Sequence, residues 1–196
     1  MINDAHVGGV TAIACANDPD KIVSGGADGS VRVWRVTAES RVMLGSMKEH
    51  KAAVNCIKVR GNDLEFVTAS SDGSCIIWDM HRFVRNNSLF ASTFFKAVLF
   101  HPDESQLLTT GTDRKITNWD AYDGSAIRIV DGSSSAEVNT LDISAEGEFF
   151  VSGGGDKLVK LWHYDEGQCQ AVGIGHSGTV SPPPVLIGHA ASLTPY

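Results

Sequence analysis

Residues 65–79 read Glu65-Phe66-Val67-Thr68-Ala69-Ser70-Ser71-Asp72-Gly73-Ser74-Cys75-Ile76-Ile77-Trp78-Asp79, and their pattern recurs three more times in the chain of 196 residues. In each copy an aspartate is followed six residues later by a tryptophan. Successive tryptophans are 44, 41 and 43 residues apart, and the four pairs use every tryptophan of the chain. The pairs are Asp28 with Trp34, Asp72 with Trp78, Asp113 with Trp119, and Asp156 with Trp162.

Each copy also keeps two apolar residues and a hydroxyl in one register. The hydroxyl stands four residues before the aspartate, and two apolar residues precede it, as expected of a strand buried on both faces. A turn and a second strand ending in the tryptophan complete a hairpin. The hydroxyls are Ser24, Thr68, Thr109 and Ser152. Repeats of roughly 40–45 residues are typical of four-stranded propeller blades. We therefore predict an all-β fold, a β-propeller of four complete blades that is partial or open, followed by an irregular C-terminal tail.

The predicted propeller occupies residues 5–174, with blades at about 10–46, 54–91, 94–130 and 137–173. A fifth repeat begins near residue 175 but then meets Pro182-Pro183-Pro184, and three prolines cannot lie in a central strand. No aspartate follows at the expected distance. We interpret residues 175–196 as an aborted fifth repeat with a proline-containing tail.

This pattern resembles the WD-repeat family, whose Trp-Asp signature stands in Trp78-Asp79 and Trp119-Asp120. In that family a histidine, the turn aspartate, the strand hydroxyl and the tryptophan form a hydrogen-bonded tetrad inside a blade. The third and fourth copies have Ala91 and Ser134 at the histidine position, so the resemblance implies two complete and two partial tetrads. The complete sets are His6, Ser24, Asp28 and Trp34, and His50, Thr68, Asp72 and Trp78; the partial sets are Thr109, Asp113 and Trp119, and Ser152, Asp156 and Trp162.

Further stretches, among them residues 122–128 and 173–178, are similar to a ciliary member of the family that has two propellers. The likeness covers about residues 3–178 and falls on part of the second propeller. It implies a non-catalytic scaffold in the axoneme of motile cilia or flagella, which lines doublet microtubules. The implied partners are tubulin and other microtubule-lining ciliary proteins.

Composition limits the other function classes. A formal net charge of −7 argues against a primary nucleic-acid binder. The polar N-terminus lacks a signal peptide, and no apolar run of 18 residues occurs, so we expect a cytoplasmic and cytoskeletal protein without membrane contact. Neither a cofactor nor a metal site is predicted. The cysteines show no CxxC spacing, and we interpret them as reduced core thiols: Cys15, Cys56, Cys75 and Cys169.

Two alternatives to the ciliary scaffold remain. A general cytosolic WD-repeat adaptor, such as a ubiquitin-ligase substrate receptor, would have the same repeats. A propeller hydrolase is the second alternative, because His6, Asp28 and Ser24 are the residue types of a hydrolytic triad. The same set recurs with a tryptophan as hydrogen-bond partner, and two of the four copies lack the histidine. This favours a structural hydrogen-bond network inside each blade over catalysis. We therefore predict no catalytic residue and no enzyme activity.

Partner contacts are predicted at local basic patches. Tubulin is acidic and this chain is net negative, so attraction would need clustered positive charge. The candidates are Arg82 with Arg85 and Arg114 with Lys115. An open arc of blades would also leave two apolar end faces exposed, and we predict self-association through the end blades.

Overall fold

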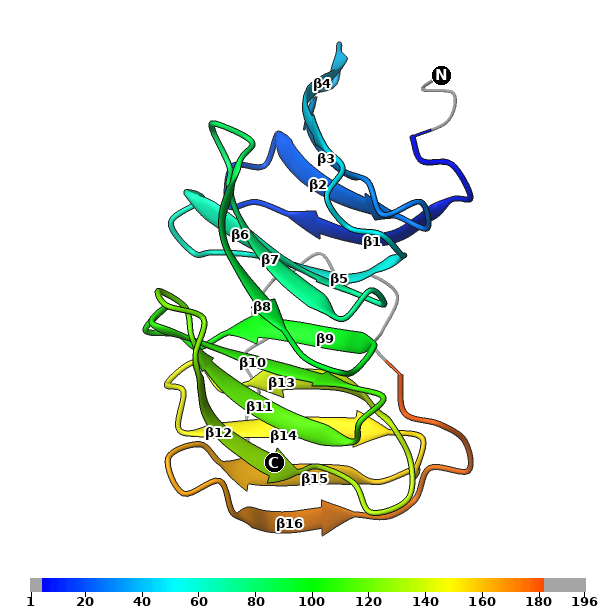
Figure 1. Ribbon diagram of the computed structural model, residues 1–196, viewed down its shortest axis with the longest axis vertical. Coiled ribbons are helices and arrows are strands. Elements are labelled where there is room, and N and C mark those ends of the chain that lie inside the picture. The colour runs from blue at the N-terminus through cyan, green and yellow to red at the C-terminus, as the bar shows by residue number, and fades with distance from the viewer. Residues whose placement is uncertain (1–4, 182–196) are drawn as a thin grey trace.

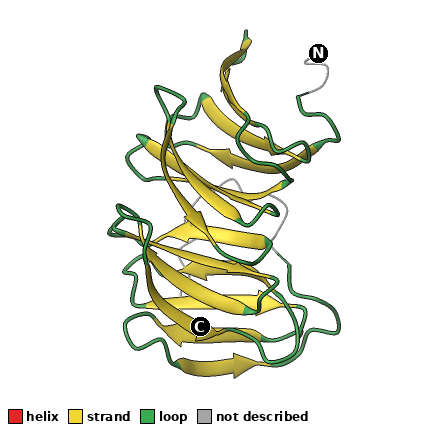
Figure 2. Ribbon diagram, viewed as in Figure 1, coloured by secondary structure: helices red, strands yellow, loops and turns green. Residues whose placement is uncertain are grey.

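The computed structural model describes residues 5–181, which form sixteen strands in four antiparallel sheets of four (Figures 1 and 2). The predicted all-β propeller architecture with four blades is confirmed. The strands of the first two blades are β1 (Val10–Cys15), β2 (Lys21–Gly26), β3 (Val31–Val36) and β4 (Arg41–Met47), then β5 (Val54–Val59), β6 (Glu65–Ser70), β7 (Ser74–Asp79) and β8 (Arg85–Phe90). Those of the last two are β9 (Phe95–Phe100), β10 (Gln106–Gly111), β11 (Lys115–Asp120) and β12 (Ala126–Asp131), then β13 (Val138–Ile143), β14 (Phe149–Gly154), β15 (Val159–His163) and β16 (Cys169–Gly173).

Each blade is a meander, because its four strands pair in chain order. The second and third strands are joined by the turn that contains the repeated aspartate. In the second blade this hairpin sets Phe66 opposite Trp78 and Val67 opposite Ile77. Since successive side chains of a strand point to opposite faces, Phe66 and Val67 lie on different faces of the sheet. Both are fully buried, as expected for a sheet packed on both sides.

The blades stack in chain order into an open arc, with the first blade at one end of the long axis and the fourth at the other (Figure 1). The first strands of successive blades, β1, β5, β9 and β13, lie beside one another. Three apolar clusters fill the three junctions between blades. The core of this protein is therefore divided among its blade junctions, and each blade depends on its neighbours for burial.

A side chain at one repeated position links each blade to the next. This position lies seventeen residues before the turn aspartate. Thr11 and Asn55 donate hydrogen bonds to backbone carbonyls of the following blade, at 2.7 and 2.6 Å. In the third blade Lys96 replaces them and pairs with Glu137 at 3.5 Å. Each link joins strands distant in sequence, so the blades hold a common register along the arc.

Among residues 5–181, the two end blades each leave one face uncovered. Ile13 in the first blade is 37% exposed, whereas its equivalents Ile57, Val98 and Leu141 are 4%, 1% and 7% exposed. At the other end, the fourth blade leaves Leu161 half-buried, although its equivalents in the first three blades are buried. The difference follows from position in the arc, because Ile13 and Leu161 are of the same apolar type as Ile57 and Ile77, which are buried in the second blade.

The cysteines depart from the expectation. All four are free, but Cys15 and Cys169 are exposed, so their interpretation as core thiols was wrong. Cys169 lies on β16, which is exposed along its whole length because it is the outermost strand of the last blade. Cys75 is buried at the junction of the second and third blades, and burial raises the pKa of its thiol.

The predicted tail falls for the most part on residues 182–196, outside the described residues. Its described part, residues 175–181, comes after β16 and returns to the fourth blade. There the amide of Val180 donates a hydrogen bond of 2.9 Å to the carbonyl of Gly154.

Candidate functional site

The first two blades contain buried hydrogen-bond networks at the positions indicated by the repeat. In the second blade Trp78 Nε1 donates to Thr68 Oγ1 at 2.8 Å, and Thr68 Oγ1 lies 2.7 Å from His50 Nε2. His50 Nδ1 lies 3.1 Å from Asp72 Oδ2. The first blade repeats the chain through Trp34, Ser24 and His6, at 2.8 and 2.7 Å.

A fifth member of each network was missed by sequence reasoning. Ser74 Oγ lies 2.9 Å from His50 Nδ1 and 2.6 Å from Asp72 Oδ1. Ser30 takes the same place between His6 and Asp28, at 2.6 and 2.7 Å. The sequence contains a signal for this serine. The turn aspartate is followed by Gly-Ser only in the two copies that also have the histidine.

The geometry fixes the direction of the protons in the second blade. The single hydroxyl hydrogen of Ser74 goes to Asp72, so His50 Nδ1 must be the donor toward Ser74. His50 Nε2 is then bare and accepts from the hydroxyl of Thr68. All donors therefore run one way, from the tryptophan through the hydroxyl and imidazole to the carboxylate. Such aligned chains strengthen one another in a low dielectric.

The electrostatics agree with a neutral imidazole beside an ionised carboxylate. Burial lowers the pKa of His50, against the attraction of Asp72. Burial also opposes ionisation of Asp72, but hydrogen bonds from Ser74 and from the amide of Lys51 outweigh it and hold the pKa of that carboxyl below its ordinary value. Burial and the Arg32 charge lower the pKa of His6 in the same way.

These shifts predict a loss of stability in mild acid. A histidine whose folded pKa lies below the unfolded value of 6.5 binds its proton more readily when unfolded. Its contribution is fully present above about pH 6.5 and is lost as the pH falls through the lowered folded pKa. We expect a lower denaturant midpoint at pH 5.5 than at pH 7.5. The control is the double variant His6→Gln/His50→Gln, which should show a smaller change; equal changes in both proteins would refute this account.

The third and fourth blades keep the tryptophan, the hydroxyl and the turn aspartate but lack the histidine. Trp119 donates to Thr109 at 2.7 Å, and Trp162 donates to Ser152 at 2.9 Å. In the third blade Thr93 Oγ1 accepts from the amide of Asp113 at 3.1 Å.

In the fourth blade, two residues outside the predicted partial tetrad bind the turn aspartate. Ser133, and not Ser134, donates to Asp156 at 2.7 Å. The ammonium of Lys160 lies 3.3 Å from the same carboxylate and donates to the carbonyl of Gly132 at 2.6 Å. Burial opposes ionisation of Asp156, but its hydrogen bonds, the one from Ser133 foremost, hold the carboxyl pKa below its ordinary value. Ser133 and Lys160 thus supply contacts to the turn carboxylate that a serine and the histidine supply in the first two blades.

The networks are unsuited to hydrolysis in this geometry. Ser24 and Thr68 are 4% and 0% exposed, and each accepts a hydrogen bond from a tryptophan. A nucleophile must reach a substrate carbon, and these oxygens lie inside a blade. The arrangement supports packing of the blades.

The predicted basic patches are not brought together. Arg82 pairs with Asp79 at 2.8 Å, and Arg85 pairs with Glu49 at 3.1 Å. Arg114 lies in the turn between β10 and β11 and donates to the carbonyl of Ser134. Because Arg82 belongs to the connection after the third strand of a blade and Arg114 to that before it, the two patches lie at opposite ends of their blades. Within residues 5–181, Arg114 and Lys115 form no ion pair, so theirs is the less neutralised patch.

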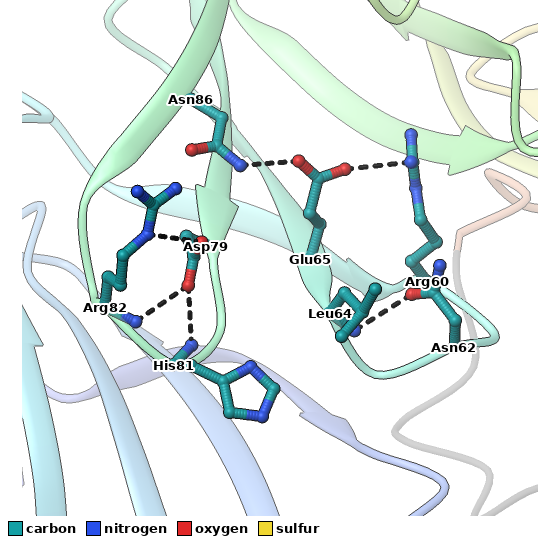
Figure 3. A pocket seen from close by; sticks show the side chains of 8 residues that line it. All are labelled: Arg60, Asn62, Leu64, Glu65, Asp79, His81, Arg82 and Asn86. Carbon is teal, nitrogen blue, oxygen red and sulfur yellow. Dashed lines mark hydrogen bonds and ion pairs between the residues drawn. The ribbon is translucent and has the colours of Figure 1, made fainter.

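An open hollow of about 500 Å³ lies beside Arg82 at the end of the second blade (Figure 3). Its charges are paired within the wall: Glu65 bridges Arg60 and Asn86, and Asp79 holds Arg82. A charged ligand would have to break these pairs. The lining residues are Arg60, Asn62, Leu64, Glu65, Asp79, His81, Arg82 and Asn86.

Two further features are absent from residues 5–181. Within that range no group of three or more His, Cys, Asp or Glu side chains is placed to hold a metal ion. The same range contains no helical segment with the length and hydropathy of a membrane span.

Repeated blades with buried tryptophan networks define a repeat-built propeller protein. The family model for "WD domain, G-beta repeat" matches residues 2–35, 41–79, 86–120 and 124–163. The chain therefore belongs to the WD-repeat family.

The chain is also similar to individual curated proteins. The chain is 62% identical over 180 residues to cilia- and flagella-associated protein 52 of Chlamydomonas reinhardtii, covering 92% of this chain and 29% of that protein. It is 49% identical over 181 residues to the Homo sapiens protein of the same name, with the same coverage. Pre-mRNA-processing factor 19 homolog 2 of Arabidopsis thaliana is 28% identical over 162 residues, which is 80% of this chain and 30% of that protein. The chain thus spans less than a third of the length of these relatives.

Proposed function

We propose that this chain is a non-catalytic WD-repeat scaffold of the ciliary or flagellar axoneme, which acts by surface contact with doublet microtubules and neighbouring proteins. The observation that carries the proposal is the 62% identity, over 92% of the chain, to a protein named for its association with cilia and flagella. Identity at this level supports a place in the cilium or flagellum for this chain.

The structure supports a scaffold in two ways. Each blade buries both faces against neighbours, so the arc presents rigid strand ends and turns as contact surfaces. The polar residues that resemble a catalytic set are buried and hydrogen-bonded to one another. Chemistry that needs an accessible nucleophile is thereby disfavoured, and binding is favoured.

The basic patches are the proposed contacts with the acidic tubulin surface. They lie at opposite ends of the blades, so a flat wall would meet one patch at a time. Arg114 and Lys115 are the stronger candidates, because Arg82 and Arg85 are already neutralised by carboxylates.

The test is retention of the tagged chain, and of the full-length relative, in detergent-extracted axonemes. Reversal of Arg114 and Lys115 to glutamate should reduce retention, and the matched reversal of Arg82 and Arg85 should reduce it less. Circular dichroism would check that both variants fold. If the unmodified proteins wash out with the soluble fraction, a general cytosolic adaptor replaces the axonemal scaffold. If both reversals stay bound like the original, the patches are ordinary surface.

A further inference from the structure

The uncovered face of the fourth blade repeats the face of the first blade that receives the second. Both faces are made by residues at the same repeat positions. In the first blade these positions are fully packed against the second blade. In the fourth they are half-buried, apart from the glycine. The equivalent pairs are Val23 and Val151, Val31 and Val159, Val33 and Leu161, and Gly25 and Gly153.

The glycine in this set leaves room for a branched side chain from the following segment, and we call this space the seat. A Cβ on Gly25 would lie 2.6 Å from Val54, the first residue of the next blade's inner strand. A Cβ on Gly153 would lie 2.5 Å from Val180 in the same manner.

The polar link beside the seat is repeated as well. Thr11 donates to the carbonyl of Val54 at 2.7 Å, and Asn139 donates to the carbonyl of Val180 at 3.4 Å. The fourth blade is therefore built to receive the first inner-strand residue of a following blade, and Val180 occupies that seat here.

The first blade offers the complementary surface. Val10 and Ile13 hold the repeat positions of Val54 and Ile57, which pack into the face of the preceding blade. Val10 and Ile13 are 49% and 37% exposed, because no blade packs against them within residues 5–181.

A basic residue on that surface does not prevent docking. Arg32 holds the repeat position of Lys160, and Lys160 is accommodated at the junction of the third and fourth blades, with its ammonium bonded to a carboxylate and a carbonyl. The chain thus shows that a cation at this position is compatible with a packed junction.

We propose that the fourth blade of one copy binds the first blade of a second copy, in the geometry of the junction between the first and second blades. Two copies joined head to tail at both ends would supply eight blades, which is within the range of closed propellers. Val10 of the second copy would take the seat of Val180, so residues 175–181 compete with the partner. The proposal does not rest on the ciliary assignment and needs only the purified chain.

The first measurement is the molar mass by light scattering over a concentration series. We expect exchange between one and two chains. Leu161→Asp and Ile13→Asp should each weaken the association about tenfold or more, since each buries an unpaired charge at both junctions. Ile129→Asp is the matched control, because Ile129 is 55% exposed on the outer strand β12 of an inner blade. A single-chain mass at every concentration, or equal effects of all three variants, would overturn the proposal.

Mixing the two interface variants tests the head-to-tail pairing. The Ile13→Asp copy keeps an intact fourth blade, and the Leu161→Asp copy keeps an intact first blade. Their mixture should form a pair with one unaltered junction, and it should associate more tightly than either variant alone. Failure of the mixture to pair, with both variants folded by circular dichroism, would exclude this junction.

A substitution at Val180 provides an independent test of the proposed junction. Val180→Gly removes the side chain that occupies the seat, so it should raise the dimer fraction several-fold. A lower dimer fraction would show that residues 175–181 make the contact themselves, and an open ladder of larger masses would overturn the closed pair.

Discussion

Replacing Asp72 by alanine is expected to destabilise the protein far more than replacing Asp113. Asp72 accepts from His50, from the amide of Lys51 and from both the amide and hydroxyl of Ser74. The variant leaves the Ser74 hydroxyl without its acceptor in a buried site, at a cost of about 1–3 kcal/mol, and the imidazole keeps Ser74 as its remaining partner at Nδ1. Asp113 accepts a 3.2 Å bond from the amide of Lys115, in a turn without histidine.

Denaturant unfolding of both variants measures the difference, with the slope of the transition as a check on cooperativity. His50→Gln is the companion variant, since it removes the imidazole but can retain a donor toward Asp72. Equal shifts of the midpoint for Asp72→Ala and Asp113→Ala would show that the network does not stabilise the second blade in the way described.

The second large effect is expected for Trp78→Ala. Trp78 is 0% exposed, belongs to the cluster between the first two blades and stacks on Phe66 at a centroid distance of 6.3 Å. Loss of a buried aromatic ring, with the cavity that remains, costs about 3–5 kcal/mol. The variant also removes the donor to Thr68.

Trp34→Ala is the matched control for this prediction. Trp34 holds the same repeat position, donates to Ser24 and is 8% exposed, but it is not part of the apolar cluster between the first two blades. Its loss should cost less, because no preceding blade packs against it. Thermal or denaturant unfolding of the two variants gives the comparison. A larger cost for Trp34 would mean that its burial within one blade outweighs packing at a junction.

The repeat made much of the fold predictable. A tryptophan at a fixed distance from a turn aspartate indicates a hairpin whether or not the histidine is present, which explains why the third and fourth blades form. The substitutes for the histidine were less accessible. Ser133 donates to Asp156, although the repeat spacing places the next residue, Ser134, at the histidine position. Lys160 was missed because its repeat position holds Arg32, Ile76 and Thr117 in the other copies, so no single residue type marks it.

Surface electrostatics were the least predictable part. The patch of Arg82 and Arg85 looked basic in the sequence, yet Asp79 and Glu49 lie against it. Glu49 is 36 residues away from Arg85, and only the fold brings them together. Ser30 and Ser74 were predictable in principle, because they occur in the same two copies as the histidine.

The side-chain links between blades have a direction that matters while the chain is being made. Thr11 and Asn55 each donate to a carbonyl that is roughly forty residues further along the chain. On the ribosome, synthesis proceeds from the N-terminus at about 5–20 residues per second, so each blade waits seconds for the acceptor that its successor carries. A nascent blade therefore remains incomplete until the next has emerged, and folding is coupled to elongation one repeat at a time.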